Sequence, residues 1–169
     1  MSKKLLYAAQ MTAFDKDGNI NLDGIRALVR YNIDVNKVDG LYVCGSTGEA
    51  FMLNTDEKKQ VMETVYDEAN GAIDLVAQVG SLNLKEAKEL AKFATDLGYP
   101  KLSAVTPFYY NFTFEQIKDY YNEILKDVDN KLLIYSIPAL TGVALTTDQF
   151  AELFENPKII GCLLYTSPS

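Results

Sequence analysis

Residues 40–71 read GLYVCGSTGEAFMLNTDEKKQVMETVYDEANG, and this stretch decides the fold class. It begins with the apolar run Gly40–Val43, continues through a turn rich in glycine and hydroxyl residues, and ends in an amphipathic segment, Thr55–Asn70. A cap at Asn54 or at the first residue of that segment, together with Gly71 after its end, marks the two ends of a helix. A strand, a loop and a helix in this order form the repeating unit of an α/β protein.

The same unit recurs along the rest of the chain. Short, almost entirely apolar runs predict strands at Leu5–Met11, Gly40–Val43, Ile73–Val79, Leu102–Thr106, Lys131–Tyr135 and Lys158–Cys162. Amphipathic segments between them predict helices at Leu22–Asn36, Thr55–Asn70, Asn83–Leu97, Phe114–Lys126 and Thr147–Phe154. Strands joined by single helices imply crossover connections and therefore a parallel sheet.

Two α/β architectures accommodate this pattern: an open, doubly wound sheet and a (β/α)8 TIM barrel. The sequence supplies five βα units and a sixth strand, and no linker or low-complexity stretch marks a second domain. A closed barrel needs about 250 residues. Because the chain has 169 residues, it would hold only part of such a barrel.

The composition excludes several classes of function. Acidic residues outnumber basic ones by 23 to 16, which leaves a net charge of −7 and no basic run for a nucleic acid or an anionic membrane. The chain has no histidine and no CxxC pair, so a transition-metal site is not expected and Ser-His-Asp or Cys-His catalysis is excluded. No signal peptide or membrane-spanning run is visible, so we expect a cytoplasmic protein with reduced thiols.

Glycines and hydroxyl residues follow the predicted strands at their carboxyl ends, where parallel α/β folds bind ligands. The second strand is followed by Gly45-Ser46-Thr47-Gly48-Glu49. Glycines let the backbone approach a ligand, consecutive N–H groups attract an anion, and two hydroxyls add donors that suit a carboxylate. A plain strand-to-helix turn capped by Ser or Thr is the alternative. The loop has neither GxGxxG spacing nor a P-loop lysine, so nucleotide binding is not indicated.

Tyrosines follow two further strands. Tyr135 ends the fifth predicted strand, where its hydroxyl could transfer a proton or simply be hydrogen-bonded within the core. Tyr109 and Tyr110 follow Pro107 and form an aromatic pair that suits either a site or surface and subunit packing. Cys44 adjoins the glycine loop without a basic neighbour in the sequence, which indicates a small buried residue.

Four motifs at matching spacing resemble one family. They are GSTGE at 45–49, AVTPFYY at 104–110, IYSIPALTG at 134–142 and NPKIIG at 156–161. Together they resemble the pyruvate-dependent class I aldolases of the N-acetylneuraminate lyase and dihydrodipicolinate synthase family, over nearly the whole chain. The resemblance implies a TIM barrel, here truncated after about the sixth strand.

Within this family the lyase form is the better match. The synthase form carries an arginine at the position of Leu140 to hold a second carboxylate, which an apolar side chain cannot do. The segment Lys101–Tyr110 also resembles the lyase form. The chain departs from the family at two places. Gln10–Phe14 stands where Thr-Pro-Phe is usual, and Ser136 stands where asparagine is common.

The resemblance implies reversible cleavage of N-acetylneuraminate to N-acetylmannosamine and pyruvate through a lysine Schiff base, without a metal or organic cofactor. By position, Ser46 and Thr47 would bind the pyruvyl carboxylate, and Tyr135 would relay a proton. Ser46 and Tyr109 would complete a chain of hydroxyls with Tyr135. Tyr109 would come from the neighbouring subunit of a homotetramer. The implied partners are small-molecule substrates and further copies of the chain, with no nucleic acid or membrane.

The Schiff-base lysine of the family is missing from this chain. Its expected position is occupied by Leu163, and the last lysine is Lys158. At a rise of roughly 3.3 Å per residue, Lys158 would lie about 16 Å away, at the opposite end of the strand. We therefore expect residues 1–161 to be the N-terminal part of a single barrel domain, and residues 162–169 to be a divergent tail that is not native family sequence.

Several interpretations of this chain stay open. An assembly junction or a frameshift would explain the tail, and a genuine truncated homologue is the alternative. The function is then that of a lyase fragment without activity of its own, of another pyruvate-dependent aldolase of the family, or of a non-catalytic protein that binds a keto acid. An open apolar sheet edge would also make the isolated chain poorly soluble.

Overall fold

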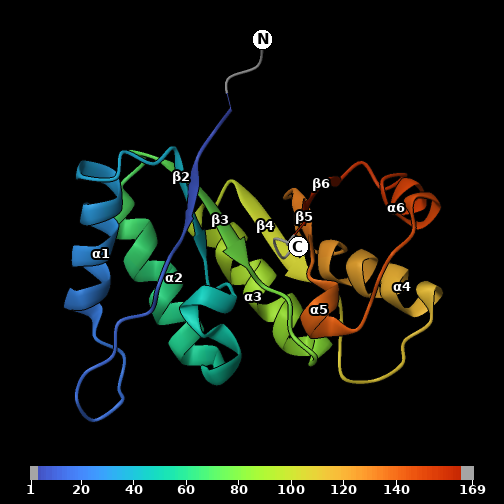
Figure 1. Cartoon of the computed structure of the whole chain (residues 1–169), viewed down its shortest axis with the longest axis horizontal. Coiled ribbons are helices and arrows are strands. Elements are labelled where there is room, and N and C mark those ends of the chain that lie inside the picture. The colour runs from blue at the N-terminus through green and yellow to red at the C-terminus, as the bar shows by residue number, and fades with distance from the viewer. Residues whose placement is uncertain (1–3, 165–169) are drawn as a thin grey trace. The chain divides into compact units, whose positions relative to one another are not determined.

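The computed structural model describes residues 4–164 (Figure 1). Its strands are β1 (Tyr7–Ala9), β2 (Gly40–Val43), β3 (Asp74–Gln78), β4 (Lys101–Val105), β5 (Leu132–Ser136) and β6 (Ile159–Leu164). Its helices are α1 (Leu22–Asp34), α2 (Thr55–Ala69), α3 (Leu84–Leu97), α4 (Phe114–Leu125), α5 (Pro138–Thr141) and α6 (Thr147–Leu153), with 3₁₀ turns η1 (Ser46–Gly48) and η2 (Ala50–Met52).

The chain forms two compact units. The first contains the residues up to Gln78 together with Asp96–Pro100, and the second contains Val79–Thr95 together with the residues from Lys101 on. Each unit has three parallel strands with helices in the connections between them, because a parallel pair needs a crossover connection.

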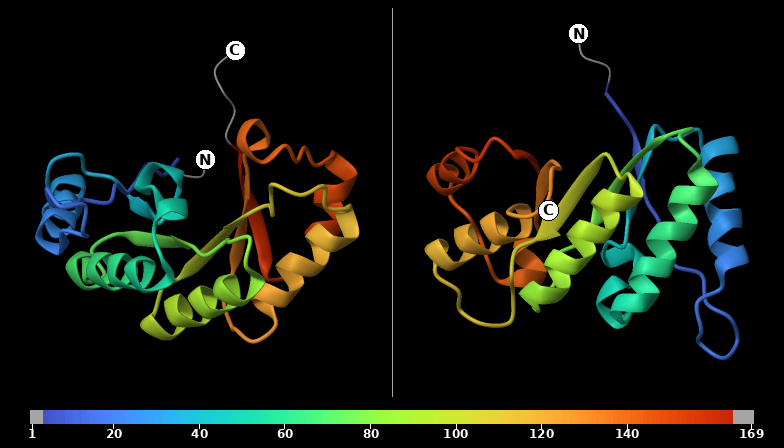
Figure 2. Two further views of the ribbon diagram at one scale, coloured as in Figure 1. Left: turned by 90° about the horizontal axis from the view of Figure 1, so that it is seen from below. Right: turned by 180° about the vertical axis from the view of Figure 1, so that it is seen from behind.

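In the first unit, β2 is the middle strand. It pairs with β1, where Gly40 is the register partner of Tyr7, and with β3, where the same glycine is the partner of Asp74. All four residues of β2 are buried. Helices α1 and α2 lie side by side (Figures 1 and 2). The loop that follows β2 therefore starts from a buried strand held on both edges.

Helix α2 begins at a capping box directly after that loop. The Asn54 side chain accepts a hydrogen bond from the N–H of Glu57, and the Glu57 carboxylate accepts one from the N–H of Asn54. Each bond satisfies a donor that the first helical turn leaves without a partner. The far end of the loop is thereby fixed as well.

In the second unit, β5 is the middle strand between β4 and β6. Tyr135 of β5 is the register partner of Val105 on β4 and of Leu163 on β6. Residues in register project from the same face of a sheet, because the side-chain direction alternates along each strand. Tyr135 and Leu163 are thus neighbours on one face.

Ion pairs join the helices of the second unit, which Figure 2 shows around its strands. The ammonium of Lys88 on α3 lies 2.8 Å from the carboxylate of Glu123 on α4. Lys118 on α4 pairs with Glu152 on α6. These pairs are partly exposed, so we expect each to stabilise the fold by less than about 1 kcal/mol. The apolar packing beneath them supplies the larger part.

The predicted strands and helices agree with the structure apart from their ends, with two differences. The first strand was predicted at Leu5–Met11 and extends only over Tyr7–Ala9, because Leu5 and Leu6 find no apolar cover and are 55% and 60% exposed. The short helix α5 was not predicted. Its start is favoured by a proline at the first helical position, and Gly142, in the left-handed region with φ 68°, ends it.

The sequence analysis expected no membrane-spanning segment, and the helices of the structure bear on this expectation. Within residues 4–164, no helix combines the length and the apolar character needed to cross a bilayer. The cytoplasmic location stays a prediction.

Candidate active site

The loop after β2 presents two hydroxyl side chains. It folds as the 3₁₀ turn η1, in which the N–H of Gly48 donates to the carbonyl of Gly45 at 3.1 Å and the N–H of Glu49 donates to that of Ser46 at 3.0 Å. Ser46 is half-buried and Thr47 is exposed. Among the residues that the structure describes, neither hydroxyl makes a hydrogen bond. Both can therefore donate to a ligand.

Two left-handed residues flank this turn. Cys44 has φ 57° and Glu49 has φ 55°, a region that few residues other than glycine adopt. Each such residue costs on the order of 1–3 kcal/mol, and it persists only where its surroundings hold it. The loop is thus kept in one unfavourable conformation, which is frequent at ligand-binding sites.

The Cys44 thiol is not a nucleophile. Burial raises the pKa of Cys44 to about 12, and the charge of Lys58 opposes this rise only in part. The thiol is therefore protonated at neutral pH, whereas the thiolate is the reactive form. Its sulfur lies 3.7 Å from the carbonyl oxygen of Lys58. The prediction that Cys44 is a small buried residue is confirmed, since it is 1% exposed.

Two polar side chains that the sequence analysis did not assign to the site hold the loop. The Thr12 hydroxyl donates to the carbonyl of Gly48 at 2.6 Å, and the Gln78 amide donates to the carbonyl of Cys44 at 3.2 Å. A Cβ on Gly48 would lie 2.8 Å from the carbonyl oxygen of Gln10, so only glycine fits there. The sequence offered only a weak signal for Gln78, a polar residue within the apolar run predicted at Ile73–Val79, and nothing local indicated its partner.

In the second unit, Tyr135 and Leu163 lie together. Tyr135 is buried, at 6% exposed, and its register partner Leu163 is 40% exposed. Leu163 has no functional group that could attack a carbonyl. The structure therefore places an apolar side chain beside the tyrosine at the position where the family resemblance requires an amine.

Lys158 does not replace the missing amine. It directly precedes β6, and its ammonium donates to the carbonyls of Leu125 at 3.0 Å and Val128 at 2.6 Å, at the end of α4. A cation there is favoured by the negative end of the helix dipole. The prediction that Lys158 lies at the wrong end of its strand is consistent with this position.

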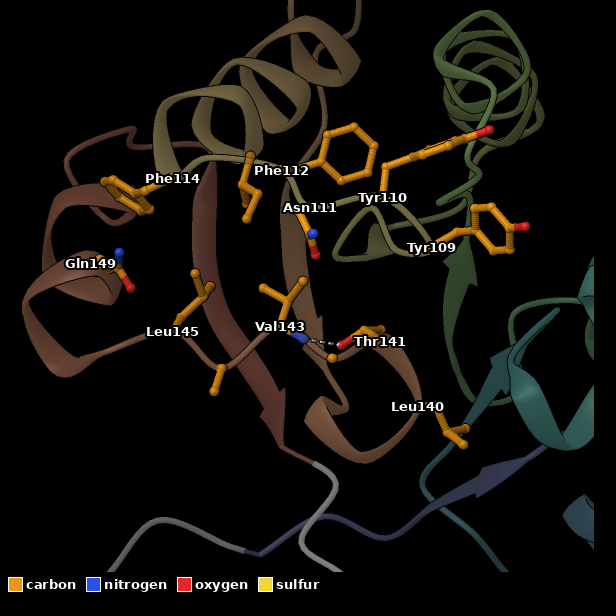
Figure 3. A pocket seen from close by; sticks show the side chains of 13 residues that line it. Tyr109, Tyr110, Asn111, Phe112, Phe114, Leu140, Thr141, Val143, Leu145 and Gln149 are labelled. Atoms are coloured by element: carbon orange, nitrogen blue, oxygen red, sulfur yellow. Dashed lines mark hydrogen bonds between the residues drawn. The ribbon is translucent and has the colours of Figure 1, made fainter.

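Tyr109 and Tyr110 lie in the loop after β4, at one end of a pocket of about 550 Å³ (Figure 3). They are 81% and 67% exposed, and their rings meet edge to face with centroids 5.0 Å apart. Tyr109 has φ 77°, which is an outlier for an aromatic residue. Leu140 of α5 also lines this pocket and is 69% exposed. The two tyrosines predicted as an aromatic pair thus lie together and are exposed.

The predicted site residues divide between the two units. Ser46 and Thr47 belong to the first unit, whereas Tyr109, Tyr135 and Leu163 belong to the second. Across residues 4–164, no group of three or more Cys, Asp or Glu side chains is arranged to hold a metal ion. The predicted site residues that the chain does carry offer hydroxyl groups at Ser46 and Thr47 and phenols at Tyr109 and Tyr135.

Comparison with known proteins assigns the family. The sequence model of the dihydrodipicolinate synthetase family matches residues 2–163. The chain belongs to this family. It is 98% identical over 167 residues to the N-acetylneuraminate lyase of Lactiplantibacillus plantarum, covering 99% of this chain and 57% of that protein. It is 66% identical over 158 residues to the N-acetylneuraminate lyase of Clostridium perfringens, covering 94% of this chain and 55% of that protein.

The solved structures agree with this assignment. The crystal structure of CdNal from Clostridium difficile in complex with mannosamine is 62% identical, with a TM-score of 0.96, and the match covers 99% of this chain and 58% of that one. The N-acetylneuraminate lyase of Fusobacterium nucleatum matches with a TM-score of 0.89 at 58% identity, covering 94% of this chain and 55% of that one. The chain thus spans little more than half the length of these relatives.

These matches confirm the predicted fold class, a truncated (β/α)8 TIM barrel. They do not test the predicted boundary between residues 1–161 and the tail 162–169, which stays a prediction. The first three tail residues, Cys162–Leu164, continue β6, and residues 165–169 lie outside the described part of the chain.

Proposed function

We propose that this chain is the amino-terminal part of an aldolase that reversibly cleaves N-acetylneuraminate to N-acetylmannosamine and pyruvate. The observation that carries the proposal is the near-identity to the Lactiplantibacillus plantarum lyase, which extends through the loops after β2, β4 and β5. Leu140 supports the lyase over the synthase branch, because a leucine cannot pair with the second carboxylate that the synthase form holds with arginine.

Each site residue has a proposed role. Ser46 and Thr47 bind the pyruvyl carboxylate with their hydroxyls and neighbouring N–H groups, which their unpartnered hydroxyls support. Tyr135 relays a proton as the imine forms and as the carbon–carbon bond breaks. Tyr109 completes a hydroxyl chain with Ser46 from a neighbouring copy in a homotetramer. Its exposure and its strained backbone support this role.

The chemistry requires an amine that this chain lacks. In a class I aldolase, a lysine amine adds to the pyruvyl ketone and water leaves. The protonated imine accepts the electron pair of the breaking carbon–carbon bond and becomes an enamine. Because Leu163 stands where that lysine is expected, we propose that this chain binds pyruvate without forming the covalent adduct and is inactive by itself. We place it in the cytoplasm, which its two free cysteines support.

A second candidate is a non-catalytic protein that binds a keto acid, and the pairing of Leu163 with Tyr135 favours it. It keeps the anion loop and gives up the covalent step. An aldolase of the same family with another aldehyde substrate is the third reading. The source DNA at codon 163 separates the first two, because a lysine codon indicates a lyase fragment and a leucine codon indicates a protein that only binds. Product analysis with different aldehydes separates the lyase from the third.

The experiment is a pyruvate titration of the chain, followed by the amide signals of Ser46–Glu49 in two-dimensional NMR. We expect these signals to shift with pyruvate, and we expect the Ser46→Ala, Thr47→Val double variant to bind about tenfold more weakly or worse, because it loses donors to a charged group. Thr95→Val, which removes a half-buried hydroxyl of the second unit, is the matched control. Unchanged pyruvate affinity in the double variant contradicts the carboxylate assignment.

Borohydride reduction in the presence of pyruvate tests the missing amine. Intact mass should show no adduct on this chain, whereas a full-length lyase with its lysine, treated in parallel, should gain one. An adduct on this chain would overturn the role assigned to Leu163. Product analysis of the full-length relative with N-acetylmannosamine and other aldehydes then decides the substrate.

A further inference from the structure

The loop after β2 accepts hydrogen bonds from two side chains, one that follows β1 and one on β3. Thr12 lies three residues after β1, and its hydroxyl donates to the carbonyl of Gly48 at 2.6 Å. Gln78 is the last residue of β3, and its amide donates to the carbonyl of Cys44 at 3.2 Å. All four residues belong to the first compact unit.

Both bonds fall on peptide groups that adjoin a left-handed residue. The Cys44 carbonyl, which Gln78 binds, belongs to the residue with φ 57°. The Gly48 carbonyl, which Thr12 binds, belongs to the peptide group that precedes Glu49, with φ 55°. A peptide group next to a strained residue can rotate to relieve the strain. A donor on its carbonyl opposes that rotation.

The burial of Gln78 is unusual for its type. It is 3% exposed at the end of a strand whose preceding three residues are buried and apolar. Burying an amide is unfavourable unless the amide is hydrogen-bonded, and its bond to the Cys44 carbonyl supplies a partner. A methionine of similar length would fill the same space without the donor.

We propose that Thr12 and Gln78 are positioning residues that fix the two peptide groups on either side of Ser46 and Thr47. With both carbonyls held, the turn between them keeps one orientation, and its two hydroxyls face a ligand without having to reorganise. That the ligand is the carboxylate of a keto acid rests on the proposed function. The fixing of the loop does not, because it is a property of the free chain.

Hydrogen exchange in the free chain tests the fixing directly. The N–H groups of Glu49 and Ala50 donate to carbonyls within the loop, at 3.0 and 3.4 Å, so their exchange reports its opening. We expect Thr12→Val to speed this exchange about fivefold, as loss of one hydrogen bond predicts. Thr12→Ser keeps the donor and should leave exchange within about twofold of the unchanged chain.

Two further variants keep the test specific. Gln78→Met should speed the same two amides, again by about fivefold. Thr95→Val removes a hydroxyl of similar exposure that bonds to Asn130 in the second unit, and it should leave them unchanged. A pyruvate titration at the same amides should then show weaker binding in Thr12→Val and normal binding in Thr12→Ser.

The outcomes separate this inference from the proposed function. Exchange that is unchanged in Thr12→Val and Gln78→Met overturns the inference, as does faster exchange with pyruvate affinity fully retained. Exchange that rises in both variants and is restored by Thr12→Ser, with weaker pyruvate binding in step, supports it. If the unchanged chain shows no response to pyruvate but the exchange pattern is as expected, the loop is positioned as proposed and the keto-acid assignment fails.

Discussion

The loop after β2 and the paired strands β5 and β6 differ in how much of a site they provide. The loop has two hydroxyls without partners, two strained residues at its ends and two side chains that bind its carbonyls. The strand pair offers Tyr135, and beside it a leucine. The groups proposed to bind the ligand are thus present in one unit, whereas the amine expected for catalysis is missing from the other.

This difference follows from how a barrel site is built. Each strand contributes its own residues at its carboxyl end, so one strand can lose its functional group without disturbing another. The loop's conformation depends on Thr12, Cys44 and Gln78, which belong to the first unit, whereas β6 belongs to the second. The proposed anion binding and the covalent step of the family therefore depend on separate parts of the chain.

Replacing Leu163 with lysine has the largest expected effect. The new amine would stand beside Tyr135, on the same face of the sheet, and we expect a pyruvate adduct after borohydride reduction where the unchanged chain gives none. Leu164→Lys is the matched control, because Leu164 is also exposed on β6 but is the next residue in unbroken register, so its side chain points to the other face. An adduct of equal yield in the control would show that the position next to Tyr135 has no special role.

Removing the Tyr135 hydroxyl comes next. In a chain that carries Leu163→Lys, the further change Tyr135→Phe should slow adduct formation by about 10² to 10⁴, the usual effect of losing a positioned proton-transfer group. The rate is read from the growth of the trapped adduct with time. Tyr110→Phe removes an exposed hydroxyl and should leave the rate unchanged. A normal rate in Tyr135→Phe would leave the tyrosine with a packing role only.

Much of the fold could be predicted because it depends on local pattern. The apolar run Gly40–Val43 and the capped segment that starts at Thr55 each coincide with an observed element boundary. The helix α5 was missed because the residues around Pro138 also suit a plain turn. The two registers that matter most, with Tyr135 between β4 and β6, depend on long-range pairing that no local signal encodes.

The site could be predicted only in its most visible parts. Glycines and hydroxyls in the loop after β2 indicated an anion site, and Leu163 was identified by the family resemblance. Thr12 and Gln78 escaped notice because their role comes from contacts 36 and 34 residues away along the chain. The left-handed backbone at Cys44 could not be predicted either, since cysteine has no preference for that region.

Adding a methyl group at Gly48 tests whether the loop after β2 is held rigidly in place. In Gly48→Ala the new Cβ would lie 2.8 Å from the Gln10 carbonyl oxygen, which is too close for a van der Waals contact. We expect the free energy of unfolding to fall by about 1–3 kcal/mol, as for other overpacked sites, measured by urea denaturation. Pyruvate binding should weaken as well. Unchanged stability would mean that the loop moves freely away from β1 and is not held as described.

The smallest expected effect concerns the thiol at the start of the loop. The pKa of Cys44 is about 12 in the folded chain, against an ordinary value of 9.0, because burial disfavours the thiolate. Between these two pH values the folded state holds a proton that the unfolded state has released. Stability should therefore fall as the pH rises above about 9, by up to about 1.4 kcal/mol per pH unit from this group.

Cys44→Ala isolates that contribution. Cys162, whose pKa burial raises to about 11, adds a slope of the same sign, so the measurement is the difference between the two chains. Urea denaturation should be measured at about pH 8, 9 and 10, around the ordinary pKa of a thiol. The free energy of unfolding should fall less steeply with pH in the variant than in the unchanged chain. Parallel declines would mean that Cys44 reaches solvent in the folded chain. The strained end of the loop after β2 would then open to water. The loop would be less rigid than described, and it would differ less from the strand pair β5–β6.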